Sequence, residues 1–446
     1  MEKKKKMSVV HLTIITAINM MGSGIIMLPA NLAQVGTMSV LSWLVTAVGA
    51  AFLAYSFSRA GMYSRNSGGM GGYAQYSFGK AGAFMANYTY GVSLLIANVA
   101  IAVSTVGYAS ALFNIQQSEI GIALSTIFVL WLASVLNFGG AHFTGRLSTV
   151  TVWGIIIPLI TICVAGWFFF NPSHYVQAWN PHNYSVFTGI GNSIAITLWA
   201  FLGLESASAD MDAVENPRKN VPIAVISGTL IAAVLYIIST NVIQGIVPNA
   251  DLANSSAPFG LAFSRMFNPV IGDIVIALMV LSCFGSLLGW QFTIAEVFRS
   301  SAQEGYFPKF FNKILDNGTP LRGIVIITAV QSLLALMTIS PSLSKQFNLL
   351  VDLAVVTNAI PYVLSMAALN TIQTADGTVA KGAKTFTNVI ALLAGIYTLY
   401  AIYNSGATAV LYGSLVTFLG WTLYGFISSR FDLPKLGNQA GNGAKA

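Results

Sequence analysis

Residues 197–206 read Thr197-Leu-Trp-Ala-Phe-Leu-Gly-Leu-Glu205-Ser206 and lie inside an apolar run from 190 to 209, which is long enough to cross a lipid bilayer. A carboxylate at the centre of a membrane helix is disfavoured by about 2.5–3.5 kcal/mol, so by default it belongs to a functional site and has a partner. Gly203 loosens the helix beside Glu205, and Trp199 lies about 9 Å away along the axis of a regular helix. The acid, the break and the aromatic ring together predict a cation site inside the membrane. The alternative is a carboxyl group that only hydrogen-bonds to a neighbouring helix.

The composition of the chain is typical of a polytopic membrane protein. Its 446 residues are 55% hydrophobic and 8% charged, with a mean hydropathy of +0.71, whereas soluble domains carry about 25% charged residues. The net charge of +7 could suggest a nucleic-acid partner, but the basic residues are confined to loops, and we expect no nucleic acid. Lys3–Lys6 precede an apolar run of more than 20 residues without a small-residue cleavage site, which predicts an uncleaved first helix and not a signal peptide.

Twelve apolar runs of helical length follow one another and predict an all-α protein with twelve transmembrane helices. The loops alternate in charge, because 19 of the 21 Lys and Arg residues lie on one side and only Arg265 and Lys345 lie on the other. By the positive-inside rule, both termini are expected in the cytoplasm. The expected spans are 8–34, 38–62, 83–112, 119–140, 147–170, 187–211, 222–247, 270–298, 322–340, 347–372, 385–404 and 408–428.

The first span contains a second irregularity, Asn19-Met-Met-Gly22-Ser23-Gly24-Ile25, with Pro29 shortly after it. Small residues of this kind are also common where membrane helices pack together. However, the second break follows about 180 residues later, and two interrupted helices at corresponding positions indicate a transporter built from inverted repeats. We therefore expect a single transporter domain over 1–446, with repeats at 8–170 and 187–372 and two peripheral helices at 385–428.

Helix breaks inside a membrane offer backbone groups for ligand binding. Unwound carbonyls and half-helix C-termini can hold an ammonium group, and N–H groups at half-helix N-termini can hold a carboxylate. Ser23 and Gly24 would supply such N–H groups, and Ser23 adds a hydroxyl. The breaks therefore predict an amino acid or an amine as substrate, and Glu205 adds a preference for cationic ones.

Several short motifs occur in the spans and in the loops between them. They are Gly22-Ser-Gly-Ile25 with Leu28-Pro-Ala-Asn-Leu32, Gly68-Gly-Met-Gly-Gly-Tyr73, Gly203-Leu-Glu-Ser206, Glu215-Asn-Pro-Arg218 with Pro222, and Glu304-Gly-Tyr-Phe-Pro-Lys309. In this order the chain resembles the basic amino acid/polyamine antiporters of the amino acid–polyamine–organocation superfamily, from the first span to the last. Residues 85–100 and 286–293 look most similar to the members that exchange putrescine for ornithine.

The resemblance implies a LeuT-type fold, in which ten spans form two inverted five-helix repeats. It places the substrate's amino group on first- and sixth-span carbonyls, around Met20, Trp199 and Leu202, and its carboxylate at the first break, on Ser23 and Gly24. The distal end of the substrate lies near the third and eighth spans, which matches Asn98 and Trp290. Tyr90 and Trp199 match two aromatic residues that close over the substrate, and Glu205 matches the sixth-span acid that takes part in substrate binding or proton coupling.

Several of these side chains also have a purely structural explanation. Trp199 and Trp290 could anchor their helices at a membrane interface, although both are expected well inside spans. Asn98 could make an interhelical hydrogen bond, and Tyr90 could simply pack against its neighbours.

Three further charged residues are candidates for the site. Glu296 and Arg299, near the inner end of the eighth span, are a candidate gate pair. Asp352 is expected in the tenth span, where it could hold the distal ammonium of a diamine or reach the outer interface beside Lys345.

The resemblance implies exchange of an amino acid for its decarboxylation product by alternating access, with putrescine and ornithine as the expected pair. A second expected mode is proton-coupled putrescine uptake, with Glu205 as the proton carrier. Alternatives are the arginine/agmatine or lysine/cadaverine pair, or, in another class, an amine-binding membrane sensor or channel. The expected location is a bacterial inner membrane, with a homodimer suggested by analogy.

We expect no enzyme activity, cofactor or metal. The four histidines are scattered near span ends and loops, and both cysteines lie within apolar spans. Residues 68–72 contain glycines as a phosphate loop does, but no strand precedes them and no Lys-Ser or Lys-Thr follows.

Overall fold

The computed structural model describes residues 8–21, 23–66, 68–205, 214–340 and 342–431. In these ranges the chain is helical without β-strands, which confirms the all-α prediction. Nine of the described helices are long and apolar enough to cross a membrane, and three further apolar helices are shorter. The chain is therefore a polytopic membrane protein. The shorter three are α1 (Val9–Met20), α9 (Val186–Trp199) and α14 (Leu321–Met337).

The first expected span is interrupted as its sequence predicts. Helix α1 ends at Met20, a single 3₁₀ turn η1 covers Ser23–Ile25, and α2 covers Leu28–Ala33. Pro29 lies in the first turn of α2, where its missing N–H leaves no hydrogen bond unmade. Glycine and proline thus divide one apolar run into two half-helices.

The third expected span begins earlier in the structure than in the sequence prediction. Helix α4 covers Gly69–Leu112, whereas the apolar run suggested a start at residue 83. Gly79 has φ 60° and ψ −155°, so it breaks the helix into a short first part and a long second part. The apolar run in the sequence covers only the second part. The remaining elements are η2 (Thr37–Ser39), α3 (Val40–Tyr63), α5 (Glu119–Leu136), η3 (Asn137–Gly139), α6 (Ala141–Thr151), α7 (Trp153–Ala165), η4 (Gly166–Phe169), α8 (Pro172–Gln177), α10 (Pro217–Ile246), α11 (Asn249–Ala253), α12 (Pro258–Met266), α13 (Pro269–Gln303), η7 (Lys309–Asn312), α15 (Leu343–Asp376), α16 (Lys381–Asn404), α17 (Ala407–Ile427) and η8 (Ser428–Arg430).

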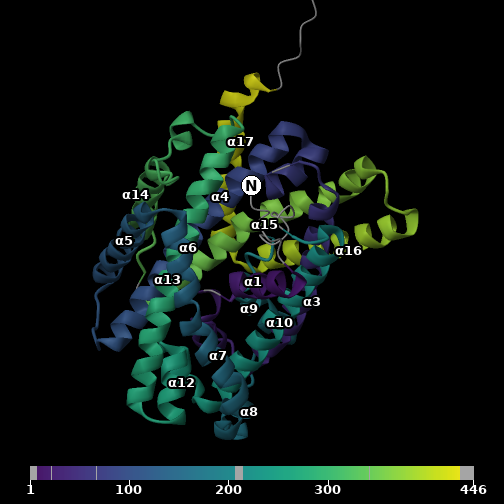
Figure 1. Cartoon of the computed structure of the whole chain (residues 1–446). Coiled ribbons are helices and arrows are strands. Elements are labelled where there is room, and N and C mark those ends of the chain that lie inside the picture. Colours follow the sequence, from purple (N-terminus) through teal and green to yellow (C-terminus); the bar gives the residue numbers. More distant parts are fainter. Residues whose placement is uncertain (1–7, 22, 67, 206–213, 341, 432–446) are drawn as a thin grey trace, which may run out of the picture.

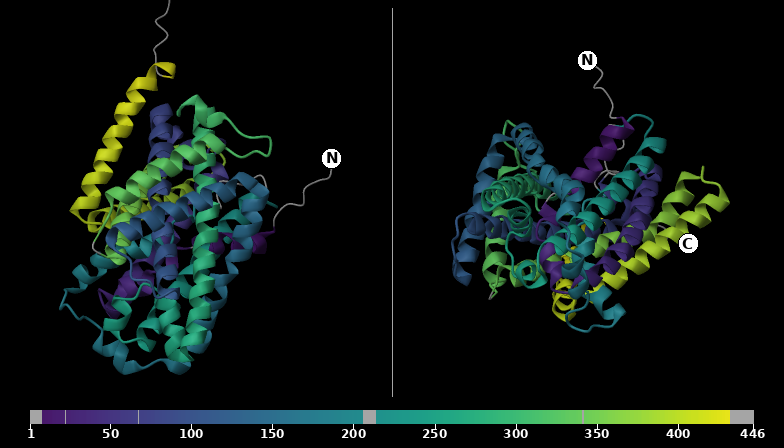
Figure 2. Two further views of the ribbon diagram at one scale, coloured as in Figure 1. Left: turned by 90° about the vertical axis from the view of Figure 1, so that its left-hand side faces the viewer. Right: turned by 90° about the horizontal axis from the view of Figure 1, so that it is seen from below.

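Helix α4 forms the centre of the bundle, and α13 and α15 pack along it. Its most apolar window is 83% buried, compared with 17% for the window of α17. Helices α16 and α17, coloured green-yellow to yellow, lie at the edge of the bundle in both views of Figure 2. The short helices α8 and α12 lie together at one end of the molecule in Figure 1.

The two helix breaks lie side by side. A Cβ atom added to Gly24 would be 3.5 Å from the Cα of Ala200, and one added to Gly203 would be 3.4 Å from the carbonyl oxygen of Asn19. Both distances are ordinary van der Waals contacts, so the backbones of the two breaks are close neighbours. The fold therefore brings the first and sixth expected spans together at their irregular points.

Glycine also sets the distance between α3 and α16, which allows a test of the packing. A Cβ atom at Gly49 would overlap the ring of Tyr397, while Gly395 on α16 has no atom within 4 Å of its Cβ position. We expect Gly49→Ala to lower the free energy of unfolding by about 1–3 kcal/mol, because an overfilled contact forces side chains and backbone to shift.

The measurement is thermal unfolding of the purified protein in one detergent. Gly395→Ala is the matched control, and we expect it to preserve the melting temperature or raise it, since alanine favours the helix by about 0.5–1 kcal/mol. Equal melting temperatures for the two variants would contradict the close packing of Gly49 against Tyr397.

Candidate functional site

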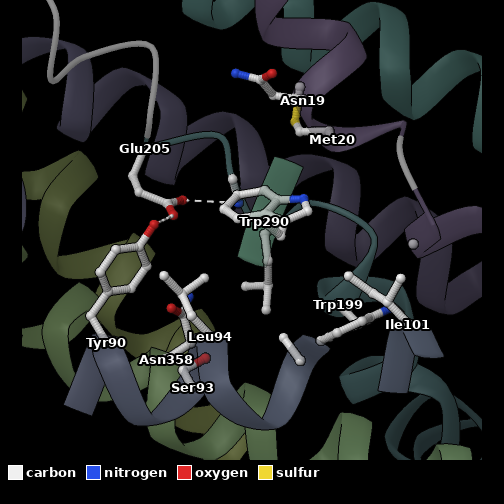
Figure 3. Close-up of a pocket in the computed structure, with 14 residues that line it drawn as sticks. Asn19, Met20, Tyr90, Ser93, Leu94, Ile101, Trp199, Glu205, Trp290 and Asn358 are labelled. Carbon is white, nitrogen blue, oxygen red and sulfur yellow. Dashed lines mark hydrogen bonds between the residues drawn. The ribbon is translucent and has the colours of Figure 1, made fainter. Parts of the chain in front are cut away.

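A cavity of about 40 Å³ lies where the two breaks meet α4, α13 and α15. One water needs about 10–15 Å³ of such volume, so the cavity holds a few waters. Figure 3 shows its walls, with Trp290 in the middle and Glu205 and Trp199 on different sides. Of the residues singled out in the sequence, it is lined by Met20, Gly24, Tyr90, Trp199, Leu202, Glu205 and Trp290.

The Glu205 carboxylate is held by hydrogen-bond donors from three parts of the chain. Its Oε1 accepts from the Tyr90 hydroxyl at 3.1 Å, and its Oε2 accepts from the Tyr362 hydroxyl at 2.5 Å. Oε2 also accepts from the backbone N–H of Gly203 at 3.0 Å. Hydrogen bonds to an ionised acceptor are the strong ones, and a buried carboxylate needs them. Glu205, only 6% exposed, thus joins α4 and α15 to the second break.

The second break has a defined backbone geometry. Helix α9 ends at Trp199, and the chain continues in turns in which the N–H of Leu202 bonds to the carbonyl of Trp199. Gly203 has φ +102°, in the region that glycine tolerates and other residues avoid. This conformation lets the Gly203 N–H point back at the carboxylate two residues later. The local sequence Gly203-Leu-Glu205 therefore builds its own anion-holding turn.

Trp290 separates this cavity from a larger one. The larger cavity, which we call the vestibule, has a volume of about 450 Å³ and lies between α1, α6, α7 and α13. The two cavities share three lining residues, Asn19, Tyr90 and Trp290. These side chains therefore form the partition between the vestibule and the site.

Trp199 lies on the far side of the cavity from Glu205 (Figure 3). Its ring meets Phe347 edge-on, with centroids 6.4 Å apart and an angle of 88°. Its Nε1 is buried without a hydrogen-bond partner in the described part of the chain. An aromatic wall with an unpaired donor is consistent with a residue that contacts a ligand.

Asn98 does not line the cavity. It is fully buried, and its Nδ2 donates to Oε1 of Gln291 at 2.8 Å. The Nε2 of Gln291 in turn donates to Thr328 at 2.9 Å and to Gln331 at 2.8 Å. This network joins α4, α13 and α14, so Asn98 makes the interhelical hydrogen bond that the sequence left open.

The charged candidates lie apart from the cavity. Glu296 and Arg299 form an ion pair of 2.6 Å, but both belong to α13, so the pair does not connect two helices. Asp352 lies on α15, partly exposed, and has no ion pair within the described residues. Their roles as gate or distal-amine residues stay predictions. Of Ser23, the structure describes the backbone but not the side chain.

The sequence analysis missed two residues of the site, Tyr362 and Asn358. They lie one helical turn apart on α15, and Asn358 lines the cavity while it is only 2% exposed. The Asn358 side chain interacts with the hydroxyl of Tyr362, which binds Glu205. Both flank Pro361 inside an apolar run, which was a usable signal, because polar groups and proline are unfavourable in a membrane helix.

The family model described as "Amino acid permease" matches residues 7–427. The chain therefore belongs to the amino acid permease family, and the membership predicted from its motifs is confirmed. The members of this family are membrane permeases.

Three relatives illustrate the range of similarity. The chain is 64% identical to "Putrescine transporter PotE" of Haemophilus influenzae (strain Rd) over 433 residues, which are 97% of the chain and 99% of that relative. It is 62% identical to the "Putrescine transporter PotE" of Escherichia coli (strain K12) over 431 residues, 97% of the chain and 98% of the relative. It is 31% identical to the "Cadaverine/lysine antiporter" of the same strain over 374 residues, 83% of the chain and 84% of the relative.

The hydroxyl of Tyr362 provides a test of the carboxylate's hydrogen bonds. We expect Tyr362→Phe to lower the free energy of unfolding by about 1.5–3 kcal/mol, because a hydrogen bond to a charged group contributes about that much. Thermal unfolding of the purified protein measures the change.

Tyr236→Phe is the matched control, since Tyr236 is also fully buried but its hydroxyl has no partner among the described residues. We expect this control to be neutral or stabilising. A loss of stability in the control as large as in Tyr362→Phe would show that burial of the hydroxyl, and not its bond to Glu205, matters.

Proposed function

We propose that the protein is an antiporter that exchanges cytoplasmic putrescine for external ornithine by alternating access. The observation that carries this proposal is the Glu205 carboxylate, which lies in a membrane cavity at the meeting point of two broken helices. Two relatives that the chain matches at 62–64% identity are named putrescine transporters. A diamine carries two ammonium groups, and a buried carboxylate is the natural counter-ion for one of them.

The walls of the cavity suit an amine with an apolar middle. One ammonium binds beside Glu205 and the carbonyls of the breaks, near Met20, Trp199 and Leu202. The methylene groups lie against Trp290, whose ring face also attracts cations. An α-carboxylate is held at Ser23 and Gly24, and the distal end of the substrate lies toward Trp290. An ammonium that replaces the hydroxyl of Tyr90 or Tyr362 at Glu205 loosens a contact of the break with α4 or α15 and so couples binding to movement.

Alternating access follows from two inverted repeats, 8–170 and 187–372, with 385–428 peripheral and twelve spans in all. The packing supports this division, because α1 packs against α10 and α3 packs against α9. In an inverted repeat the first and sixth spans correspond, as do the second and seventh, so these two contacts are equivalent. The vestibule opens toward the cytoplasm, and Asn19, Tyr90 and Trp290 separate it from the site.

The exchange carries one net positive charge outward, since putrescine has two positive charges and ornithine a net one. In a second mode, Glu205 takes up a proton and drives uptake of putrescine. We place the protein in a bacterial inner membrane with both termini in the cytoplasm, and we propose a homodimer. No cofactor takes part.

The second candidate is the same exchange with another pair. It is favoured by the 31% identity to a relative named "Cadaverine/lysine antiporter", and an arginine/agmatine exchanger belongs to the same class. An amine sensor or channel is the alternative of another class, and it predicts no flux that depends on substrate on the opposite side.

Counterflow in proteoliposomes separates these functions. Vesicles loaded with putrescine should take up labelled ornithine faster than empty vesicles, because exchange requires a substrate for the return step. Faster uptake with internal cadaverine or agmatine would change the substrate pair. Absence of stimulation by any internal amine would contradict the antiporter.

Glu205→Gln removes the negative charge and keeps the shape of the side chain. We expect it to weaken putrescine binding about five- to thirtyfold, since hydrogen bonds to charged groups exceed neutral ones by roughly 1–2 kcal/mol, and to abolish proton-coupled uptake. Equilibrium binding and uptake driven by a pH gradient are the measurements. Glu119→Gln, at an exposed position in the first turn of α5, is the control. Unchanged affinity and coupling in Glu205→Gln would refute the role of the acid.

A further inference from the structure

A third cavity lies on the other side of the first break from the vestibule. It has a volume of about 340 Å³ and is bounded by the start of α2, the residues between α11 and α12, and the start of α15. We call it the outer chamber, because it contains Lys345, one of the two basic residues on the side opposite to the termini. Met27, which directly precedes α2, forms its inner wall.

The outer chamber has a positively charged lining. It includes Gln34, Asn254, Ser256 and Lys345, together with other serines, and it includes no Asp or Glu. The amide and hydroxyl groups can donate or accept hydrogen bonds, and Lys345 adds one full positive charge. Such a lining attracts a carboxylate and repels an ammonium group.

The Lys345 charge is not neutralised by the protein. Within the described ranges, no carboxylate oxygen lies within 4.0 Å of its ammonium. The other basic residue of this face, Arg265, is engaged by Asp251 at 2.9 Å. Of the two basic residues of this face, Lys345 is therefore the one that no described carboxylate engages.

The chamber is tied to the helix that contains the first break. The Ser344 hydroxyl donates to Oδ1 of Asn31 at 2.9 Å and accepts from Nε2 of Gln34 at 3.0 Å. These bonds fasten the start of α15 to α2. Asn31 is 1% exposed, and its Nδ2 is a further donor that no described residue satisfies. A ligand that competes for Ser344 would therefore loosen α2 from α15.

We propose that the outer chamber is a second substrate site, which captures the α-carboxylate of an incoming cationic amino acid beside Lys345 before the amino acid passes to the cavity at Glu205. The inference rests on the proposed exchange and on its sidedness. A diamine has no carboxylate and gains nothing at Lys345. The chamber therefore favours the amino acid over the diamine at the outer face, whereas the vestibule lining contains no Lys or Arg.

The test compares Lys345→Gln, which removes the charge, with Lys345→Arg, which keeps it. Right-side-out vesicles are loaded with putrescine, and the KM values of labelled external ornithine and of labelled external putrescine are measured. Lys345→Gln should raise the KM of ornithine about two- to fivefold, the effect of one solvent-accessible ion pair, and leave that of putrescine unchanged or lower. Lys345→Arg should behave as the unchanged protein. The difference in ornithine KM between Lys345→Gln and the unchanged protein should shrink as salt is added, because ions screen exposed charges.

Two outcomes would contradict the proposal that the outer chamber is a substrate site. One is an ornithine KM that Lys345→Gln leaves unchanged, and the other is an equal change for ornithine and putrescine, which would indicate a general structural effect. If the unchanged protein shows no exchange at all, the proposed function fails separately. Equilibrium binding of labelled ornithine to the purified variants then tests the second substrate site, since Lys345→Gln must still bind ornithine more weakly than Lys345→Arg.

Discussion

The hydrogen bonds around the Glu205 carboxylate are the interaction on which the rest of the site depends. In a membrane, a carboxylate without donors is too costly to keep, and Tyr90, Tyr362 and the Gly203 N–H supply them from separate parts of the chain. The same bonds hold the second break in place against α4 and α15. A ligand that competes for the carboxylate therefore acts on the helices that enclose it, so binding and movement share one set of contacts.

The polar groups of the interior follow the same constraint. Gln291, Asn98 and Gln331 are fully buried and joined by hydrogen bonds, which link α4, α13 and α14. By contrast, the Nε1 of Trp199 has no partner among the described residues and lies at the cavity wall, where a ligand can reach it.

The three cavities form a sequence across the molecule. The vestibule and the central cavity meet at Trp290, and the outer chamber ends at Met27 beyond the first break. Their linings differ in charge, with a carboxylate at the centre and a lysine in the outer chamber. In the exchange that we propose, this arrangement would give the two sides different selectivity without a change in the central site.

The sequence by itself determined the helical membrane fold and its two breaks, because hydropathy and glycine act locally along the chain. Gly203, Glu205 and the first-span glycines were therefore evident, and the family resemblance added Met20, Tyr90, Leu202 and Trp290 to the expected lining. Only the tertiary structure decided that Tyr362 binds Glu205, that Asn98 faces Gln291, and that the pair Glu296–Arg299 stays within one helix. The start of α4 at Gly69 was also missed, since that part of the helix lacks a membrane-length apolar run. Which residues of distant helices share a hydrogen bond depends on how those helices rotate and pack, and no local property of the chain records that.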